Sequence, residues 1–254
     1  MIGIYFSGTG NSKYALEVFL REYNDNPVLF SIEDKNLKNH INNHDEIVFS
    51  YPVQYSAVPK FLSDYIHNNS EMWQGKRVFI IATMALFSGD GAGVLGRLLK
   101  QYGAKIIGGL HLQMPDSIAD EKVLKRSLKK NIKLVENANK KIAKAVINAK
   151  NGEYPQEGLG FLSRFLGFVI QRLWFGHRTQ KYSNQLKIDA GKCIGCSKCA
   201  NICPTENIIM EDNKAKGKDK CTVCYRCVNS CPKQAITLLG KTVVEQTCIE
   251  KYLK

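Results

Sequence analysis

The fold of the N-terminal half is decided by one stretch near the start of the chain, 2-IGIYFSGTGNS-12. Residues 2–6 form a short apolar run typical of a buried strand. Residues 7–12 combine glycines with hydroxyl side chains, and residues 11–23 place apolar side chains at helical spacing. A helix that begins directly after a glycine-rich turn presents free backbone amides, which favour a phosphate group. The stretch therefore predicts a strand and a helix of an α/β domain with an anion site between them.

Apolar runs and amphipathic stretches continue to alternate over the first 120 residues. Further strands are predicted at residues 28–32, 46–51, 77–83 and 105–112, and helices near residues 58–66 and 91–102. Alternating strands and helices form a parallel sheet that is covered on both faces. Residues 119–150 lack Pro and Gly and repeat apolar residues at helical spacing, which predicts one long helix.

A second motif, C-x2-C-x2-C-x3-C-P, occurs twice in the C-terminal part of the chain. Its cysteines are Cys193, Cys196, Cys199 and Cys203 in the first run and Cys221, Cys224, Cys227 and Cys231 in the second. Structural zinc is the alternative ligand, but two C-x2-C pairs would satisfy it, and it leaves the third and fourth cysteine of each run unexplained. The duplicated spacing predicts two [4Fe-4S] clusters.

Residues 184–240 resemble the bacterial two-cluster ferredoxins, in which the fourth cysteine of each run binds the other cluster. The resemblance implies that one cluster binds Cys193, Cys196, Cys199 and Cys231, and the other Cys221, Cys224, Cys227 and Cys203. The segment departs from that family because residues 183–254 carry 12 basic and 7 acidic side chains. We therefore expect redox partner proteins of another kind, acidic ones among them. Cys248 lies outside both runs, and we interpret it as a structural or incidental thiol, with a redox role as the alternative.

The loop at residues 7–12 resembles the FMN phosphate loop of flavodoxins and is neither a Walker loop nor a dinucleotide fingerprint. The resemblance implies a flavodoxin-like α/β fold with a five-stranded parallel sheet of order 2-1-3-4-5 and its ligand at the carboxyl ends of the strands. The implied phosphate-loop residues are Ser7, Gly8, Thr9, Gly10, Asn11 and Ser12. The implied flavin contacts are Pro52, Val53, Gln54, Tyr55, Thr83, Met84, Phe87, Gly89 and Asp90. Tyr55 and Phe87 are the candidates to flank the ring, although either could simply pack against its own loop.

The two motifs predict a flavodoxin-like FMN-binding domain at residues 1–150, a connector at 151–182 and a small α+β two-cluster ferredoxin domain at 183–254. Together they resemble flavodoxin–ferredoxin fusion proteins of anaerobic prokaryotes. The connector includes an apolar helix near residues 161–175, which is interrupted by Arg164 and Arg172 and is too short to span a bilayer. We expect this helix to pack between the domains or in a homodimer interface, with a peripheral membrane contact as the alternative.

Composition places the chain among globular proteins, since 44% of its 254 residues are hydrophobic and 23% are charged. The N-terminus shows no signal peptide, so we expect a cytoplasmic protein whose nine cysteines are not in structural disulfides. The net charge of +13 is concentrated in residues 121–150, which carry ten basic and two acidic side chains. We interpret these lysines as a solvated helix face, with steering of an acidic partner as the alternative. No nucleic-acid motif accompanies them, and no nucleic-acid partner is expected.

The expected function follows from the implied cofactors. FMN exchanges one or two electrons, whereas each cluster exchanges one. We expect an electron-transfer iron–sulfur flavoprotein that interconverts one- and two-electron transfer and has no catalytic side chains. One alternative is a flavoenzyme that reduces a quinone or flavin with electrons from the clusters. Another is a redox sensor whose clusters switch an interaction, so whether the chain is an enzyme stays open.

Overall fold

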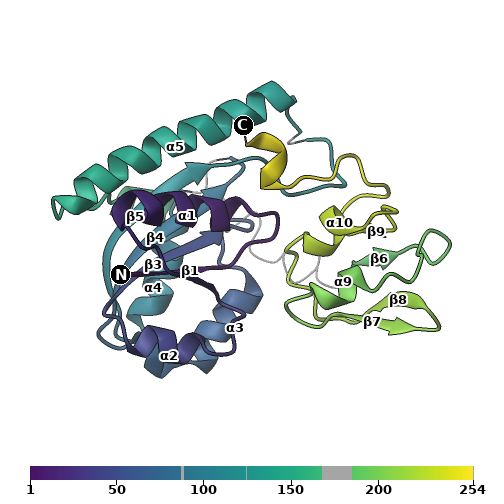
Figure 1. Cartoon of the computed structure of the whole chain (residues 1–254), viewed down its shortest axis with the longest axis horizontal. Helices are drawn as coiled ribbons and strands as arrows, with labels where there is room; N and C mark the ends of the chain where they lie inside the picture. The colour runs from purple at the N-terminus through teal and green to yellow at the C-terminus, as the bar shows by residue number, and fades with distance from the viewer. Residues whose placement is uncertain (87–88, 124, 168–184, 254) are drawn as a thin grey trace.

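Five parallel strands form the sheet of the larger, N-terminal lobe in this computed structural model (Figure 1). They are β1 (Ile2–Tyr5), β2 (Leu29–Ser31), β3 (Glu46–Pro52), β4 (Arg77–Met84) and β5 (Lys105–Gln113). Their order is β2-β1-β3-β4-β5, with every neighbouring pair parallel. This is the flavodoxin-like order, so the predicted fold class is confirmed. The structure describes residues 1–86, 89–123, 125–167 and 185–253, so Phe87 and most of the apolar connector, with Arg172, lie outside the described residues.

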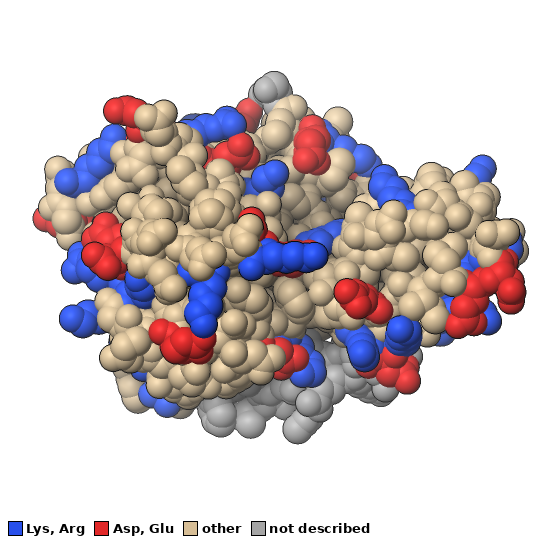
Figure 2. Space-filling model, turned by 60° about the horizontal axis from the view of Figure 1, so that its bottom comes forward, with Lys and Arg blue, Asp and Glu red and all other residues tan. Residues whose placement is uncertain are grey.

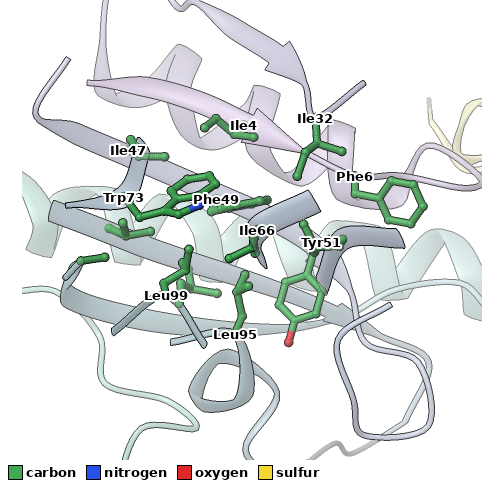
Figure 3. Close-up of a cluster of buried hydrophobic side chains, with 14 of the residues drawn as sticks. Ile4, Phe6, Ile32, Ile47, Phe49, Tyr51, Ile66, Trp73, Leu95 and Leu99 are labelled. Atoms are coloured by element: carbon green, nitrogen blue, oxygen red, sulfur yellow. The ribbon is translucent and has the colours of Figure 1, made fainter. Parts of the chain in front are cut away.

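Helices cover both faces of the sheet (Figure 1). One face carries α1 (Asn11–Tyr23) and α5 (Leu128–Lys150), and the other carries α2 (Leu37–Asn42), α3 (Lys60–Asn68), η1 (Ser70–Trp73) and α4 (Gly91–Lys100). Side chains of a strand point alternately to the two faces, and both faces are buried here, which explains the continuous apolar runs. Figure 3 shows the core under α3 and α4, where the rings of Phe49 and Trp73 lie 5.9 Å apart.

The long helix α5 begins at Leu128 and not near residue 119, which corrects the sequence prediction. The carbonyl of Ala119 accepts the amides of Val244 and Glu245, and Asp120 also bonds to remote backbone. These long-range bonds hold the described residues between 119 and 127 out of the helix. No helix in the described part of the chain is long and apolar enough to cross a membrane.

The smaller lobe is built from two short antiparallel pairs and two short helices (Figure 1). β6 (Lys187–Ile188) pairs with β9 (Ile236–Thr237), and β7 (Ile208–Glu211) pairs with β8 (Lys214–Gly217), while α9 (Lys198–Asn201) and α10 (Arg226–Ser230) each begin within a cysteine run. In the connector, α6 (Phe161–Leu166) leaves Phe161 84% exposed. The chain then returns to the larger lobe, where η3 (Ile249–Tyr252) packs Ile249 and Tyr252 into the core beside α1 and α5.

Candidate functional site

The carboxyl ends of the strands face the smaller lobe. The amide Nε2 of Gln54, after β3, donates a hydrogen bond to the carbonyl of Val223 at 3.1 Å. The backbone amide of Phe61 donates to Thr222 Oγ1 at 3.1 Å. Because Thr222 and Val223 lie between Cys221 and Cys224, the loop predicted to bind the flavin contacts the segment that carries cysteines predicted to bind one cluster.

The loop between β1 and α1 has the form of an anion site. Gly10 adopts a left-handed conformation with φ of 93° and precedes a helix that has no side-chain cap. Within the described residues, the backbone amides of residues 7–13 have no hydrogen-bond acceptor, and the buried hydroxyl of Ser7 has no partner. Consecutive free amides at a left-handed turn and a helix N-terminus are a favourable environment for a phosphate group. These observations fit the phosphate of FMN.

Two other predicted phosphate-loop side chains are engaged with the protein itself. The hydroxyl of Ser12 lies 2.7 Å from that of Thr83, and Asn11 Nδ2 donates to the carbonyl of Pro115 at 2.7 Å. These bonds tie the loop to the ends of β4 and β5. The side chains of Asn11 and Ser12 therefore shape the loop, while its amides and the Ser7 hydroxyl have no partner among the described residues.

The remaining predicted flavin contacts lie along the same edge of the sheet but differ in their surroundings. Tyr55 has a left-handed backbone with φ of 47° and packs against the core of the smaller lobe. Asp90 is fully buried and pairs with Arg97 at 2.5 Å. Gly89 is packed against the backbone of Gly167 in the connector. Pro52, Val53 and Met84 complete the ends of β3 and β4.

The eight cysteines of the two runs line two separate cavities. One cavity is lined by Cys221, Cys224 and Cys227 together with Cys203, and the other by Cys193, Cys196 and Cys199 together with Cys231. The fourth cysteine of each run thus lies with the first three of the other. In the described part of the chain no three His, Cys, Asp or Glu side chains gather closely enough to hold a single metal ion. All nine cysteines are free thiols.

Residues 185–232 match the family of 4Fe-4S dicluster domains. The chain is a fusion of a flavodoxin-like domain and a 4Fe-4S dicluster domain. The segment matched in the fusion protein includes all eight cysteines that line the two cavities. Because the strand order and the family match concern different parts of the chain, each half of the assignment has its own support.

Solved structures similar to the fusion protein include flavodoxins. Reduced Megasphaera elsdenii flavodoxin is 19% identical and covers 57% of this chain and 100% of its own, with a TM-score of 0.41. Flavodoxin 2 from Bacillus cereus is 16% identical and covers 59% of this chain and 97% of its own, with a TM-score of 0.43. No curated protein matches the fusion protein. The assignment of the fold rests on the strand pairing of the fusion protein itself.

The two cysteine cavities of the fusion protein differ in the exposure of the residues that line them. Cys196 is exposed, and the sulfur of Cys193 accepts the amide of Ala215 at 3.4 Å. Such backbone hydrogen bonds lower the pKa of the Cys193 thiol. In the other cavity, burial raises the pKa of Cys224 to about 12 and that of Cys227 well above its ordinary value. We call the cavity with Cys193, Cys196, Cys199 and Cys231 the surface cavity, because exposed residues line it. We call the cavity with Cys203, Cys221, Cys224 and Cys227 the interface cavity, because it lies against the larger lobe.

Comparison of the two cysteine runs shows which residues build the lobe interface. Thr222, Val223, Tyr225, Arg226 and Asn229 of the second run all hydrogen-bond to the larger lobe or to the segment that follows β5. The equivalent residues of the first run are Ile194, Gly195, Ser197, Lys198 and Asn201, and among the described residues none of them bonds to the larger lobe. Sequence reasoning missed these interface residues, and it named their partner Gln54 only as a flavin contact. The signal that could have revealed them is the difference in sequence between the two copies of the cysteine motif at these five positions.

Proposed function

We propose that the fusion protein transfers electrons between FMN and two [4Fe-4S] clusters, and so interconverts two-electron and one-electron transfer. FMN would bind at the carboxyl edge of the sheet, with its phosphate on residues 7–12. The clusters would bind the two sets of four cysteines that line the cavities. When bound, FMN supplies exchange of one or two electrons and each cluster supplies exchange of one.

The close approach of Cys224 to the phosphate loop is the observation that carries this proposal. A β-carbon placed on Gly8 would lie 2.1 Å from the carbonyl oxygen of Cys224. The backbone of a predicted cluster ligand therefore touches the backbone of the predicted phosphate loop. Electron transfer requires cofactors held near one another in fixed positions, and this contact fixes the two binding segments together.

The burial of the two cavities supports an order of electron transfer. None of the described residues that line the interface cavity is exposed, and among them Val228 is fully buried and Tyr225 is 3% exposed. The surface cavity is open to partners, because Ile194 beside it is 58% exposed. We infer that partners exchange electrons with the surface cluster, which exchanges them with the interface cluster and then with FMN.

The surface cavity also supports an acidic redox partner. Lys198 and Lys233 line this cavity, and both are exposed. Acidic and basic side chains are interspersed over the face shown in Figure 2, so steering depends on these local lysines more than on that whole face. Positive charge at the site of electron exchange raises the encounter rate with an acidic protein.

Cofactor analysis of protein purified under anaerobic conditions tests the proposal. Iron, acid-labile sulfide, zinc and extracted flavin would be measured per chain, and about eight irons with one FMN are expected. Rapid mixing with a one-electron reductant should then reduce clusters and flavin in phases whose rates do not depend on protein concentration. Zinc in place of iron would overturn the proposal. Steady-state turnover with a quinone or free flavin would instead indicate the flavoenzyme alternative.

A further inference from the structure

Arg226 joins three segments at the interface between the lobes. It lies between Cys224 and Cys227 in the second run, and its Nη2 donates to the carbonyl of Ser7 at 2.9 Å. Its Nη1 donates to the carbonyl of Ile202, next to Cys203, at 3.0 Å. The guanidinium thus holds the phosphate loop and both segments that supply the cysteines of the interface cavity.

The same guanidinium forms a two-point ion pair with Glu33, which follows β2. Nη1 lies 2.9 Å from one carboxylate oxygen and Nη2 lies 2.8 Å from the other. The pair is largely shielded, since the side chains of Arg226 and Glu33 are 19% and 28% exposed. Phe6, at the end of β1 (Figure 3), places its ring centroid 6.0 Å from the guanidinium carbon. Two parallel hydrogen bonds fix both position and orientation of the arginine.

Among the described residues that line the interface cavity, Arg226 alone carries a charge. Burial opposes that charge, and the two hydrogen bonds that Arg226 donates to the Glu33 carboxylate stabilise it. The potential of an iron–sulfur cluster depends on nearby charge, hydrogen bonds and solvent exposure. A cation beside a cluster favours its reduced form, because reduction adds negative charge, and the effect is strongest where water is excluded.

The duplicated motif provides an internal comparison. Lys198 occupies the position in the first run that Arg226 occupies in the second. Lys198 is exposed and, among the described residues, forms no ion pair. The cation at this position is therefore surrounded by water in the first run and is paired with a carboxylate, Glu33, in the second.

We propose that Arg226 is a positioning residue that fixes the second cysteine run on the phosphate loop and raises the midpoint potential of the interface cluster, while Glu33 opposes that effect. The inference rests on the proposed function, because it requires a cluster bound by Cys203, Cys221, Cys224 and Cys227. It goes further by assigning the tuning of one cluster to a single pair of residues that lie on different lobes.

Midpoint potentials of four variants test the inference. Arg226→Gln, Arg226→Lys, Glu33→Gln and the matched control Lys198→Gln would be titrated anaerobically in the full-length protein, with the two clusters followed by electron paramagnetic resonance. Removal of the cation in Arg226→Gln should lower the potential of the interface cluster, and removal of the anion in Glu33→Gln should raise it. Arg226→Lys should stay nearer to the wild type, and Lys198→Gln should leave the interface cluster unchanged.

Opposite shifts distinguish charge tuning from a structural role. If Arg226→Gln and Glu33→Gln retain iron and flavin but shift the potential in the same direction, or not at all, the inference is overturned. If Arg226→Gln loses iron, its potential cannot be compared, and the test then uses Glu33→Gln and Arg226→Lys. An unchanged potential of the interface cluster in Glu33→Gln would then overturn the inference. Iron analysis of the wild-type protein tests the proposed function separately. A content well below eight irons per chain would overturn that function and not only this inference.

Discussion

The carbonyl oxygen of Cys224 lies against the α-carbon of Gly8, at a position where only glycine fits. A β-carbon on Gly8 would be 2.1 Å from that oxygen, whereas real β-carbons essentially never approach another heavy atom within 3.0 Å. The obstacle is backbone, so a rotamer change cannot relieve it. Contact between the phosphate loop and the second cysteine run therefore depends on the absence of a side chain at Gly8.

Substitution of Gly8 by alanine should separate the two lobes locally. The added methyl group must displace Cys224, and overpacking of this kind costs about 1–3 kcal/mol. We expect a lower free energy of unfolding and weaker retention of flavin, measured by denaturant unfolding and by flavin fluorescence after dialysis. Gly160→Ala is the control, because among the described residues no atom beyond its chain neighbours lies within 4 Å of its added β-carbon. Equal stability of the two variants would contradict the interface described here.

Asp120 should be among the most important single residues for holding the lobes together. Its Oδ2 accepts the amides of Leu238, Leu239 and Gly240 at 2.6–3.1 Å, and its Oδ1 accepts the hydroxyl of Tyr225 at 2.8 Å. Asp120→Ala leaves several buried donors unsatisfied and should cost about 3 kcal/mol of unfolding free energy.

Tyr225→Phe is the matched control for Asp120, since it removes one of these four bonds and should cost about 1 kcal/mol. Chemical unfolding of both variants, followed by circular dichroism, measures the difference. A loss in Asp120→Ala no larger than that in Tyr225→Phe would show that the three amides find other acceptors.

Serine variants of the fourth cysteines should show which cavity each one serves. Cys203→Ser should alter the same spectroscopic signal as Cys224→Ser, because both residues line the interface cavity. Cys231→Ser should alter the same signal as Cys196→Ser, because both line the surface cavity. Each variant should retain roughly half of the iron. If Cys203→Ser instead matches Cys196→Ser, each run binds its own cluster.

His111 should make the stability of the larger lobe depend on pH. Its Nε2 accepts the amide of Ala92 at 3.0 Å, which requires an unprotonated nitrogen. Burial lowers the pKa of His111 and Lys141 adds to this, while Glu157 and Asp90 oppose it. Because the folded pKa is lower than the unfolded value of 6.5, the stabilisation is complete above pH 6.5 and is lost as the pH falls toward the folded pKa.

His111→Gln is the variant that tests this pH dependence, because a glutamine oxygen can accept the Ala92 amide at any pH. Unfolding between pH 5.5 and 7.5 should show the wild type losing stability relative to the variant as pH falls. If the difference in unfolding free energy between wild type and variant is constant across that range, the pKa of His111 is the same in the folded and unfolded states.

Most of the fold was predictable because its signals are local. The apolar runs predicted all five strands, and the glycine loop predicted the start of α1 at Asn11. α5 was predicted nine residues too long because residues 119–127 have helical composition, yet the carboxylate of Asp120 is held by backbone amides that include that of Gly240. The short α2 was also missed, since six residues carry too little periodicity to be recognised.

The sequence by itself determined which residues are candidates for the chemistry, namely a predicted anion loop after the first strand and two runs of cysteines at cluster spacing. These depend on residues close together in the chain, where backbone geometry limits what they can reach. Only the tertiary structure decided that one cavity is exposed and the other lies on the phosphate loop, and that Arg226 meets Glu33 across the interface. Such contacts join residues more than a hundred positions apart, so they exist only once both lobes have folded and packed.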